Sequence, residues 1–171
     1  YGGKWHIAAA LKDAGWHGFR CLQGANDTTL ADSCISFLRE ERDKPFFLVA
    51  AYDNPHNICE WARNQALPWG PIPEPDSIKD CPNLPSNFPI PPFEPSCLRH
   101  EQQAHIKAYP TVDFSCADWR RLRWGYFRLV EKVDREIGRI LDALRVSGLE
   151  ENTLVVFSSD HGECNGAHRW N

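Results

Sequence analysis

Apolar and polar residues first alternate with a helical period between residues 28 and 44. Leu30, Cys34, Phe37 and Leu38 recur at spacings of three and four, and a charged tail follows them. Such spacing places the four side chains on one face of a helix. Pro45 ends the pattern because proline disrupts a helix interior. The sequence therefore predicts one amphipathic helix that ends before Pro45.

A longer helical pattern covers residues 116–148 and carries an apolar stripe opposite a face of Arg, Lys and Glu. Its members are Leu122, Tyr126, Leu129, Val130, Val133, Ile137, Ile140, Leu141 and Leu144. Gly148 stands where a left-handed C-terminal cap is expected. This segment predicts a long amphipathic helix closed by glycine.

Two short runs are almost wholly apolar and are bounded by turn residues. One covers residues 46–52, between Pro45 and Asn54-Pro55, and the other covers 153–158. Runs of this kind are typical of strands covered on both faces, as in a parallel sheet. A third strand is expected to end just before Lys4. The order of elements predicts an α/β fold with a mostly parallel sheet flanked by helices.

The stretch from about 55 to 113 has a different character. Ten of the 13 prolines lie between Pro68 and Pro95, and no helical or alternating pattern persists. Its aromatic residues argue against disorder. We expect a single partial domain, residues 1–171, with this proline-rich stretch as a packed excursion.

Composition narrows the class of protein. The 171 residues carry a net charge of -4, which disfavours nucleic acid as a partner. No apolar run is long enough to span a membrane, so we expect no membrane partner either. The seven cysteines contain no Cys-x-x-Cys pair, so the sequence does not support a zinc ribbon. Independent thiols are favoured, although a disulfide involving Cys81 and Cys97 stays open.

Polar residues that could take part in catalysis or metal binding follow each expected strand. Asp160-His161 follows 153–158, Asn54-Pro55-His56 follows 46–52, and Lys4-Trp5-His6 stands near the start. Ligands of open α/β sheets gather beyond the carboxyl ends of the strands. Each cluster alone is more often an ordinary turn. Their joint position at strand ends favours one shared site.

The residue types suit an anionic, tetrahedral substrate beside a divalent metal. Asp160 offers a hard oxygen ligand and His161 an imidazole nitrogen. Lys4 is a point charge for a sulfate or phosphate oxygen. His6 and His56 can donate hydrogen bonds or transfer protons near neutral pH.

Three motifs at these positions resemble the type I, formylglycine-dependent sulfatases of the alkaline phosphatase superfamily. They are "GKWHI", "DKPFFLVAAYDNPHNICEW" and "LVEKVDREIGRILDALRVSGLEENTLVVFSSDHGE", in family order. The resemblance covers most of the chain outside the proline-rich stretch. It implies an alkaline phosphatase-like α/β fold and identifies the chain as similar to a central segment of the catalytic domain.

The resemblance also implies roles for individual residues. Asp160 and His161 would bind a divalent metal, typically Ca²⁺. Lys4 would contact the sulfate and the nucleophile, His6 would orient the nucleophile, and His56 would bind a sulfate oxygen or assist the leaving group. His168 would lie at the substrate pocket. The implied substrate is a sulfated small molecule or carbohydrate.

Three parts of the family pattern are missing, one of them a lysine that the family places shortly after the last motif. No Cys or Ser stands in Cys/Ser-x-Pro-x-Arg, where formylglycine forms, and no Asp-Asp pair occurs. We therefore expect the nucleophile and further metal ligands outside this segment, and the segment alone to be inactive. Two alternatives stay open: a phosphodiester or phosphonate hydrolase of the same superfamily, and a non-catalytic domain that binds sulfated sugars.

Overall fold

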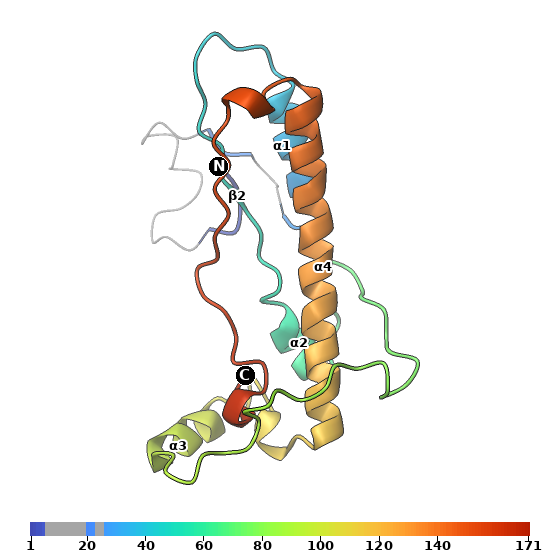
Figure 1. Ribbon diagram of the computed structural model, residues 1–171, viewed down its shortest axis with the longest axis vertical. Helices are drawn as coiled ribbons and strands as arrows, with labels where there is room; N and C mark the ends of the chain where they lie inside the picture. Colours follow the sequence, from blue (N-terminus) through green and yellow to red (C-terminus); the bar gives the residue numbers. More distant parts are fainter. Residues whose placement is uncertain (6–19, 23–25) are drawn as a thin grey trace. The chain divides into compact units, whose positions relative to one another are not determined.

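The chain folds into two units, each with its own internal contacts. The computed structural model describes residues 1–5, 20–22 and 26–171 (Figure 1). The first unit combines residues 1–54 with 131–156, and the second combines 55–130 with 157–171. No helix within the described ranges is both long and apolar enough to cross a membrane.

The first unit contains a short parallel strand pair. Strand β1 (Gly2–Gly3) pairs with β2 (Ala50–Ala51), with Gly2 opposite Ala50 and Gly3 opposite Ala51. The small parallel sheet beside helices agrees with the predicted α/β class.

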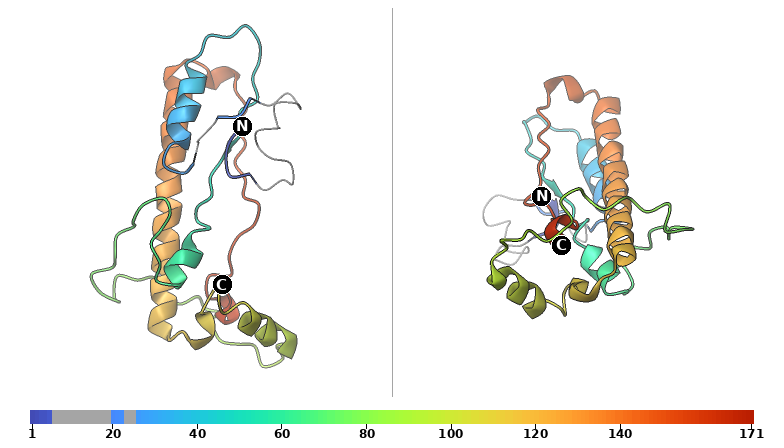
Figure 2. Two further views of the ribbon diagram at one scale, coloured as in Figure 1. Left: turned by 180° about the vertical axis from the view of Figure 1, so that it is seen from behind. Right: turned by 60° about the horizontal axis from the view of Figure 1, so that its bottom comes forward.

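Helix α1 (Leu30–Leu38) packs beside the C-terminal half of the long helix in this unit, as the two views of Figure 2 show. Its buried face consists of Leu30, Ala31, Cys34 and Leu38. Arg139 forms an ion pair with Asp32 across this contact. The predicted amphipathic helix is confirmed, and it ends well before Pro45.

The long helix α4 (Cys116–Val146) is also confirmed, together with its glycine cap. Gly148 has a φ of 68°. Its N–H donates to the carbonyl of Arg145 over 3.0 Å, and the N–H of Leu149 donates to that of Leu144 over 3.2 Å. This pair of bonds is the Schellman arrangement, which satisfies the last helical carbonyls.

The predicted apolar stripe of α4 is only partly buried. Leu122, Leu129 and Leu144 are buried, whereas Val130 and Leu141 are 40% and 42% exposed. A helix period fixes which residues share a face, but tertiary packing decides how wide a stripe is covered.

The second unit has a core built around Trp119 of α4, with Ile58, Ile72, Phe88, Leu122 and Leu129. Phe88 and Phe114 meet the Trp119 ring edge-on at centroid distances of 6.0 and 5.7 Å. The long proline-rich stretch therefore contributes to a packed core.

Helices α2 (Ile58–Ala62) and α3 (Ser96–Ala104) interrupt the stretch where the sequence pattern predicts none. Short 3-10 turns occupy Thr111–Asp113, Glu150–Asn152 and Ala167–Arg169. Apolar periodicity does not predict helix α3, because the residue that this helix buries is the polar Gln102. The boundaries of the single domain and of its excursion stay predictions.

The two expected buried strands are the main correction. Residues 153–158 form no strand with any other described residue, and Leu154 and Phe157 are 89% and 81% exposed. In the run 46–52 only Ala50–Ala51 pairs, and Phe47 is 85% exposed. A strand needs a neighbour for its backbone groups, and an apolar run does not reveal where that neighbour is.

All seven cysteines are free thiols, Cys81 and Cys97 included. The interpretation of independent cysteines therefore holds for this structure.

Candidate functional site

Lys4 leaves the sheet edge directly after β1. Its N–H donates to the carbonyl of Ala51 over 2.7 Å, which extends the β1–β2 pairing by one bond. Its Nζ lies 4.0 Å from Oδ1 of Asp53, and 18% of the Lys4 side chain and 28% of the Asp53 side chain are exposed. The structure thus places Lys4 beside the residues that follow β2, as parallel pairing predicts.

Gly3 makes this placement possible. Its φ is 95°, and a Cβ built there would lie 1.9 Å from the carbonyl oxygen of Ala51. A backbone with this φ and this close approach accepts only glycine. The glycine before Lys4 therefore has a structural reason that is independent of any resemblance.

Asp27 holds the segment after β2, and no sequence motif identified it. Its Oδ1 accepts the N–H of Asp53 and its Oδ2 the N–H of Asn54, both over 2.8 Å. Asp27 is only 6% exposed, so its carboxylate is a buried clamp on consecutive amides. Its partners are 26 and 27 residues away along the chain, so the local sequence gives no signal for these bonds.

His6 and His56 are the two histidines that the sequence predicts near Lys4. His6 lies outside the described residues. His56 is exposed in the turn before α2, where its carbonyl accepts the N–H of Cys59 over 3.3 Å. It belongs to the second unit, whereas Lys4 belongs to the first. Their expected convergence stays a prediction.

Asp160 and His161 form an exposed pair in the second unit. Nε2 of His161 lies 3.9 Å from Oδ2 of Asp160, and 62% and 69% of the two side chains are exposed. The N–H of His161 donates to Oδ1 of Asp160 over 3.1 Å. Nδ1 of His161 lies 3.1 Å from the carbonyl oxygen of Gly162. Because a carbonyl only accepts, Nδ1 carries the proton and a neutral ring keeps its lone pair on Nε2.

This geometry fits two ligands of one divalent metal. Ligand atoms lie about 2.0 to 2.6 Å from such an ion, so two of them at 3.9 Å can share it. A backbone carbonyl on the other imidazole nitrogen is the usual support of a ligating histidine. Within the described ranges, however, no group of three or more His, Cys, Asp or Glu residues could hold a metal ion. The metal site expected at Asp160 and His161 stays a prediction.

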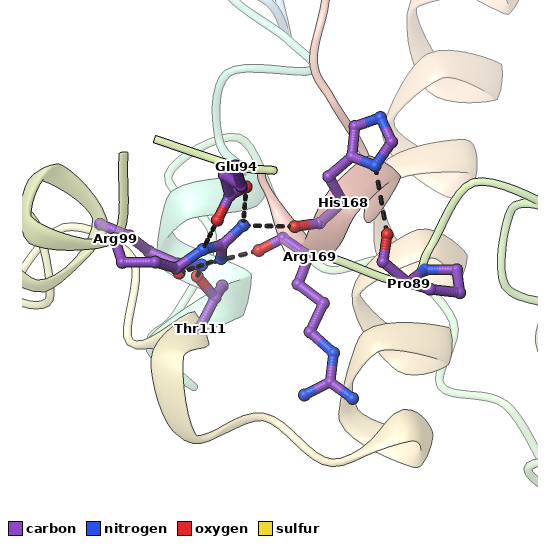
Figure 3. Close-up of polar contacts among 7 residues, drawn as sticks. Pro89, Glu94, Arg99, Thr111, His168 and Arg169 are labelled. Atoms are coloured by element: carbon purple, nitrogen blue, oxygen red, sulfur yellow. Dashed lines mark hydrogen bonds and ion pairs between the residues drawn. The ribbon is translucent and has the colours of Figure 1, made fainter. Parts of the chain in front are cut away.

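His168 lies in a tight turn at residues 165–169 in the second unit, shown in Figure 3. Its N–H donates to the carbonyl of Asn87 over 2.8 Å, and its Nδ1 lies 3.2 Å from the carbonyl oxygen of Pro89. His168 is half-buried. The proline-rich stretch thus contacts both the backbone and the imidazole of this predicted site residue.

Trp61 has a packing role. A Cβ added to Gly125 of α4 would lie 2.6 Å from the Trp61 indole, so the ring rests directly on the glycine. Its Nε1–H donates to the carbonyl of Arg121 over 3.2 Å. Through these two contacts Trp61 packs the proline-rich stretch against α4.

A known protein family matches the chain along nearly its whole length. The family model described as Sulfatase matches residues 3–170. No solved structure gives a significant match.

Curated relatives agree with the family match. An endo-4-O-sulfatase of Bacteroides thetaiotaomicron is 33% identical over 135 residues, which are 75% of this chain and 21% of that protein. The iduronate 2-sulfatase of Homo sapiens is 30% identical over 133 residues, 72% of this chain and 23% of that protein. A Delta 4,5-hexuronate-2-O-sulfatase of the same bacterium is 25% identical over 152 residues, 84% and 30% respectively.

The chain spans between 21% and 30% of the length of these relatives. The matched residues 3–170 include Lys4, His56, Asp160, His161 and His168. With the motifs in family order and one family model across the chain, the chain belongs to the sulfatase family.

Proposed function

We propose that the chain is a segment of the catalytic domain of a sulfatase that hydrolyses sulfate esters. The observation that carries the proposal is the family match over residues 3–170, which includes both Lys4 at the sheet edge and the Asp160–His161 pair. Two of the relatives are named for sulfatase activity on sugar units, an iduronate 2-sulfatase and a Delta 4,5-hexuronate-2-O-sulfatase. We therefore propose a sulfated carbohydrate or small molecule as substrate.

In this proposal Lys4 neutralises charge on a sulfuryl oxygen. It is a compact cation on a partly buried stem at the end of β1, and such charges count for more where water is restricted. His56 is exposed and can donate a proton to the leaving oxygen. His6 orients the nucleophile and His168 contacts the substrate.

Asp160 and His161 would hold the divalent metal, which we propose is Ca²⁺. When bound, the metal supplies positive charge against the anionic substrate. The carboxylate offers Oδ2 and the imidazole offers Nε2, since Nδ1 is engaged with the Gly162 carbonyl. Two ligands alone predict weak binding by the isolated chain.

The formylglycine nucleophile would come from outside this chain, because the sequence has no Cys/Ser-x-Pro-x-Arg. We accordingly propose that the isolated 171 residues do not turn over sulfate esters.

The test compares two substrates with the full-length protein that contains this chain. Hydrolysis of 4-methylumbelliferyl sulfate should far exceed hydrolysis of bis(4-nitrophenyl) phosphate in the presence of Ca²⁺. Preference for the phosphodiester would support the phosphodiesterase alternative instead. If the protein hydrolyses neither substrate but binds a sulfated sugar, the result would support the non-catalytic alternative.

A further inference from the structure

The turn that carries His168 has an unfavourable backbone. Asn165, His168 and Arg169 have φ values of 50°, 51° and 59°, and Gly166 between them has 96°. L-residues other than glycine rarely adopt this left-handed region; asparagine and histidine do so more often than most, but arginine does not. Such a conformation persists only where surrounding groups hold it, and it concentrates at functional sites.

Helix α3 supplies the groups that hold this turn. Nη2 of Arg99 donates to the carbonyl of His168 over 2.7 Å, and Nε2 of Gln102 donates to the carbonyl of Arg169 over 2.7 Å (Figure 3). Two consecutive carbonyls are thus bound by two side chains one helical turn apart. The two side chains of α3 therefore fix the direction of both carbonyl groups.

Both of these side chains are themselves fixed. Glu94 accepts from Nε and Nη2 of Arg99, and these hydrogen bonds lower the pKa of the Glu94 carboxyl. Nη1 of Arg99 donates to Oε1 of Gln102 over 2.7 Å. Because Arg only donates and a carbonyl only accepts, the Gln102 amide has one consistent orientation. Gln102 is 7% exposed, so this orientation is enforced inside the protein.

Residues 87–89, which precede α3 in the proline-rich stretch, orient the imidazole of His168. The Pro89 carbonyl lies 3.2 Å from Nδ1 of His168, and the Asn87 carbonyl binds the His168 N–H. Since the Pro89 carbonyl can only accept, Nδ1 bears the proton when the ring is neutral. The lone pair then lies on Nε2, which becomes a hydrogen-bond acceptor.

We propose that residues 87–102 form a positioning element for His168, with Arg99 as its central positioning residue. The element selects the Nδ1–H tautomer and presents Nε2 as an acceptor for a hydroxyl group of the substrate. The hydroxyl contact rests on the sulfatase function proposed above. The positioning of the ring rests only on the contacts of the second unit.

The tautomer can be measured directly in the 171-residue chain. Long-range ¹H–¹⁵N spectra at pH 8.5, where an unperturbed imidazole is neutral, distinguish a protonated from an unprotonated ring nitrogen. His168 is assigned by its loss in His168→Gln. We expect Nδ1 to be the protonated nitrogen, although free histidine in water favours Nε2–H. A dominant Nε2–H form in the wild-type chain would overturn the proposal.

Variants separate positioning from general stability. Arg99→Ala should shift the His168 ring toward the mixture found in free histidine. Arg99→Lys keeps the charge but cannot bind Glu94 and the His168 carbonyl in the same forked geometry, so it should shift the ring in the same direction. Arg145→Ala is the matched control, because the Arg145 side chain forms an exposed ion pair with Asp142. An unchanged tautomer in Arg99→Lys, with Trp119 signals intact, would contradict a positioning role.

The hydroxyl contact is tested in the full-length protein. Arg99→Lys should lower kcat/KM about tenfold for a sulfated sugar with a neighbouring hydroxyl, the typical effect of one lost hydrogen bond. For 4-methylumbelliferyl sulfate, which lacks that hydroxyl, the change should stay within about twofold. Equal losses on both substrates would refute the hydroxyl contact. If the full-length protein hydrolyses no sulfate ester, both the proposed function and the hydroxyl contact are wrong. The positioning of His168 is still tested separately, by the tautomer of its ring in the 171-residue chain.

Discussion

At the scale of single residues, Asp27 shows how a buried carboxylate can fix the backbone next to a candidate site. Its two oxygens bind the amides of Asp53 and Asn54, and Asp53 in turn lies beside Lys4. Periodicity could not reveal Asp27, because a polar residue in a loop looks the same whether it faces solvent or clamps a distant strand end. Its partners are 26 and 27 residues away.

Asp27→Asn should lower the free energy of unfolding by about 2 kcal/mol, because charge-assisted hydrogen bonds to buried amides are replaced by one neutral acceptor and a mismatched NH₂ group. Urea denaturation measures the change. Asp32→Asn is the control, since that carboxylate is 64% exposed and its ion pair should contribute less than about 1 kcal/mol. Equal effects of the two substitutions would contradict the clamp.

Cys34 is a buried thiol whose ionisation is affected by the fold. Burial raises the pKa of its thiol from 9.0 to about 11. Between these values the unfolded chain loses the proton and the folded chain keeps it. Stability from this group is therefore complete below pH 9 and falls as pH rises toward 11.

At pH 8, iodoacetamide labelling followed by mass spectrometry should modify the exposed Cys97, Cys116 and Cys164 long before Cys34. The alkaline loss of stability should be smaller in Cys34→Ala than in Cys97→Ala. Labelling of Cys34 as fast as Cys97 would show that its site is open to solvent.

At the scale of elements, the parts predicted well are those specified by local sequence. Helix α4 and its cap depend on residues within a few positions of one another, so periodicity and one glycine suffice. The run 153–158 was predicted from apolar content, but strand pairing depends on a neighbour that local sequence does not identify. Helix α3 was missed because it lies among prolines and its function is to donate polar groups.

Two glycines of the long helical segment should respond in opposite ways to alanine. Gly148→Ala should destabilise the protein by about 1 kcal/mol, because its φ of 68° is strained for a residue with a Cβ. Gly138→Ala should stabilise it by up to about 1 kcal/mol, since it lies inside the helix and, beyond the helix backbone itself, no atom of the described residues lies within 4 Å of the added Cβ. Thermal unfolding of both variants measures this. Stabilisation by Gly148→Ala would contradict the Schellman cap.

At the scale of the whole molecule, the family was predictable because its motifs are sequence patterns, whereas the assembled site was not. Lys4 reached the predicted sheet edge through the β1–β2 pairing. Asp160 and His161 have a geometry suited to one metal but lie in the other unit, and His6 lies outside the described residues. Motif order predicts membership, but the relative placement of distant segments depends on packing across the fold.

The most direct test of the central claim is the effect of Lys4→Ala on sulfate-ester hydrolysis by the full-length protein. We predict that kcat/KM for 4-methylumbelliferyl sulfate falls at least about a hundredfold, as expected when a charge-stabilising group is removed from a transition state. The exposed Lys79 provides the control, and Lys79→Ala should change kcat/KM less than about twofold. A folded Lys4→Ala protein that keeps more than about a third of its activity would contradict the assignment of Lys4 to the sulfate site.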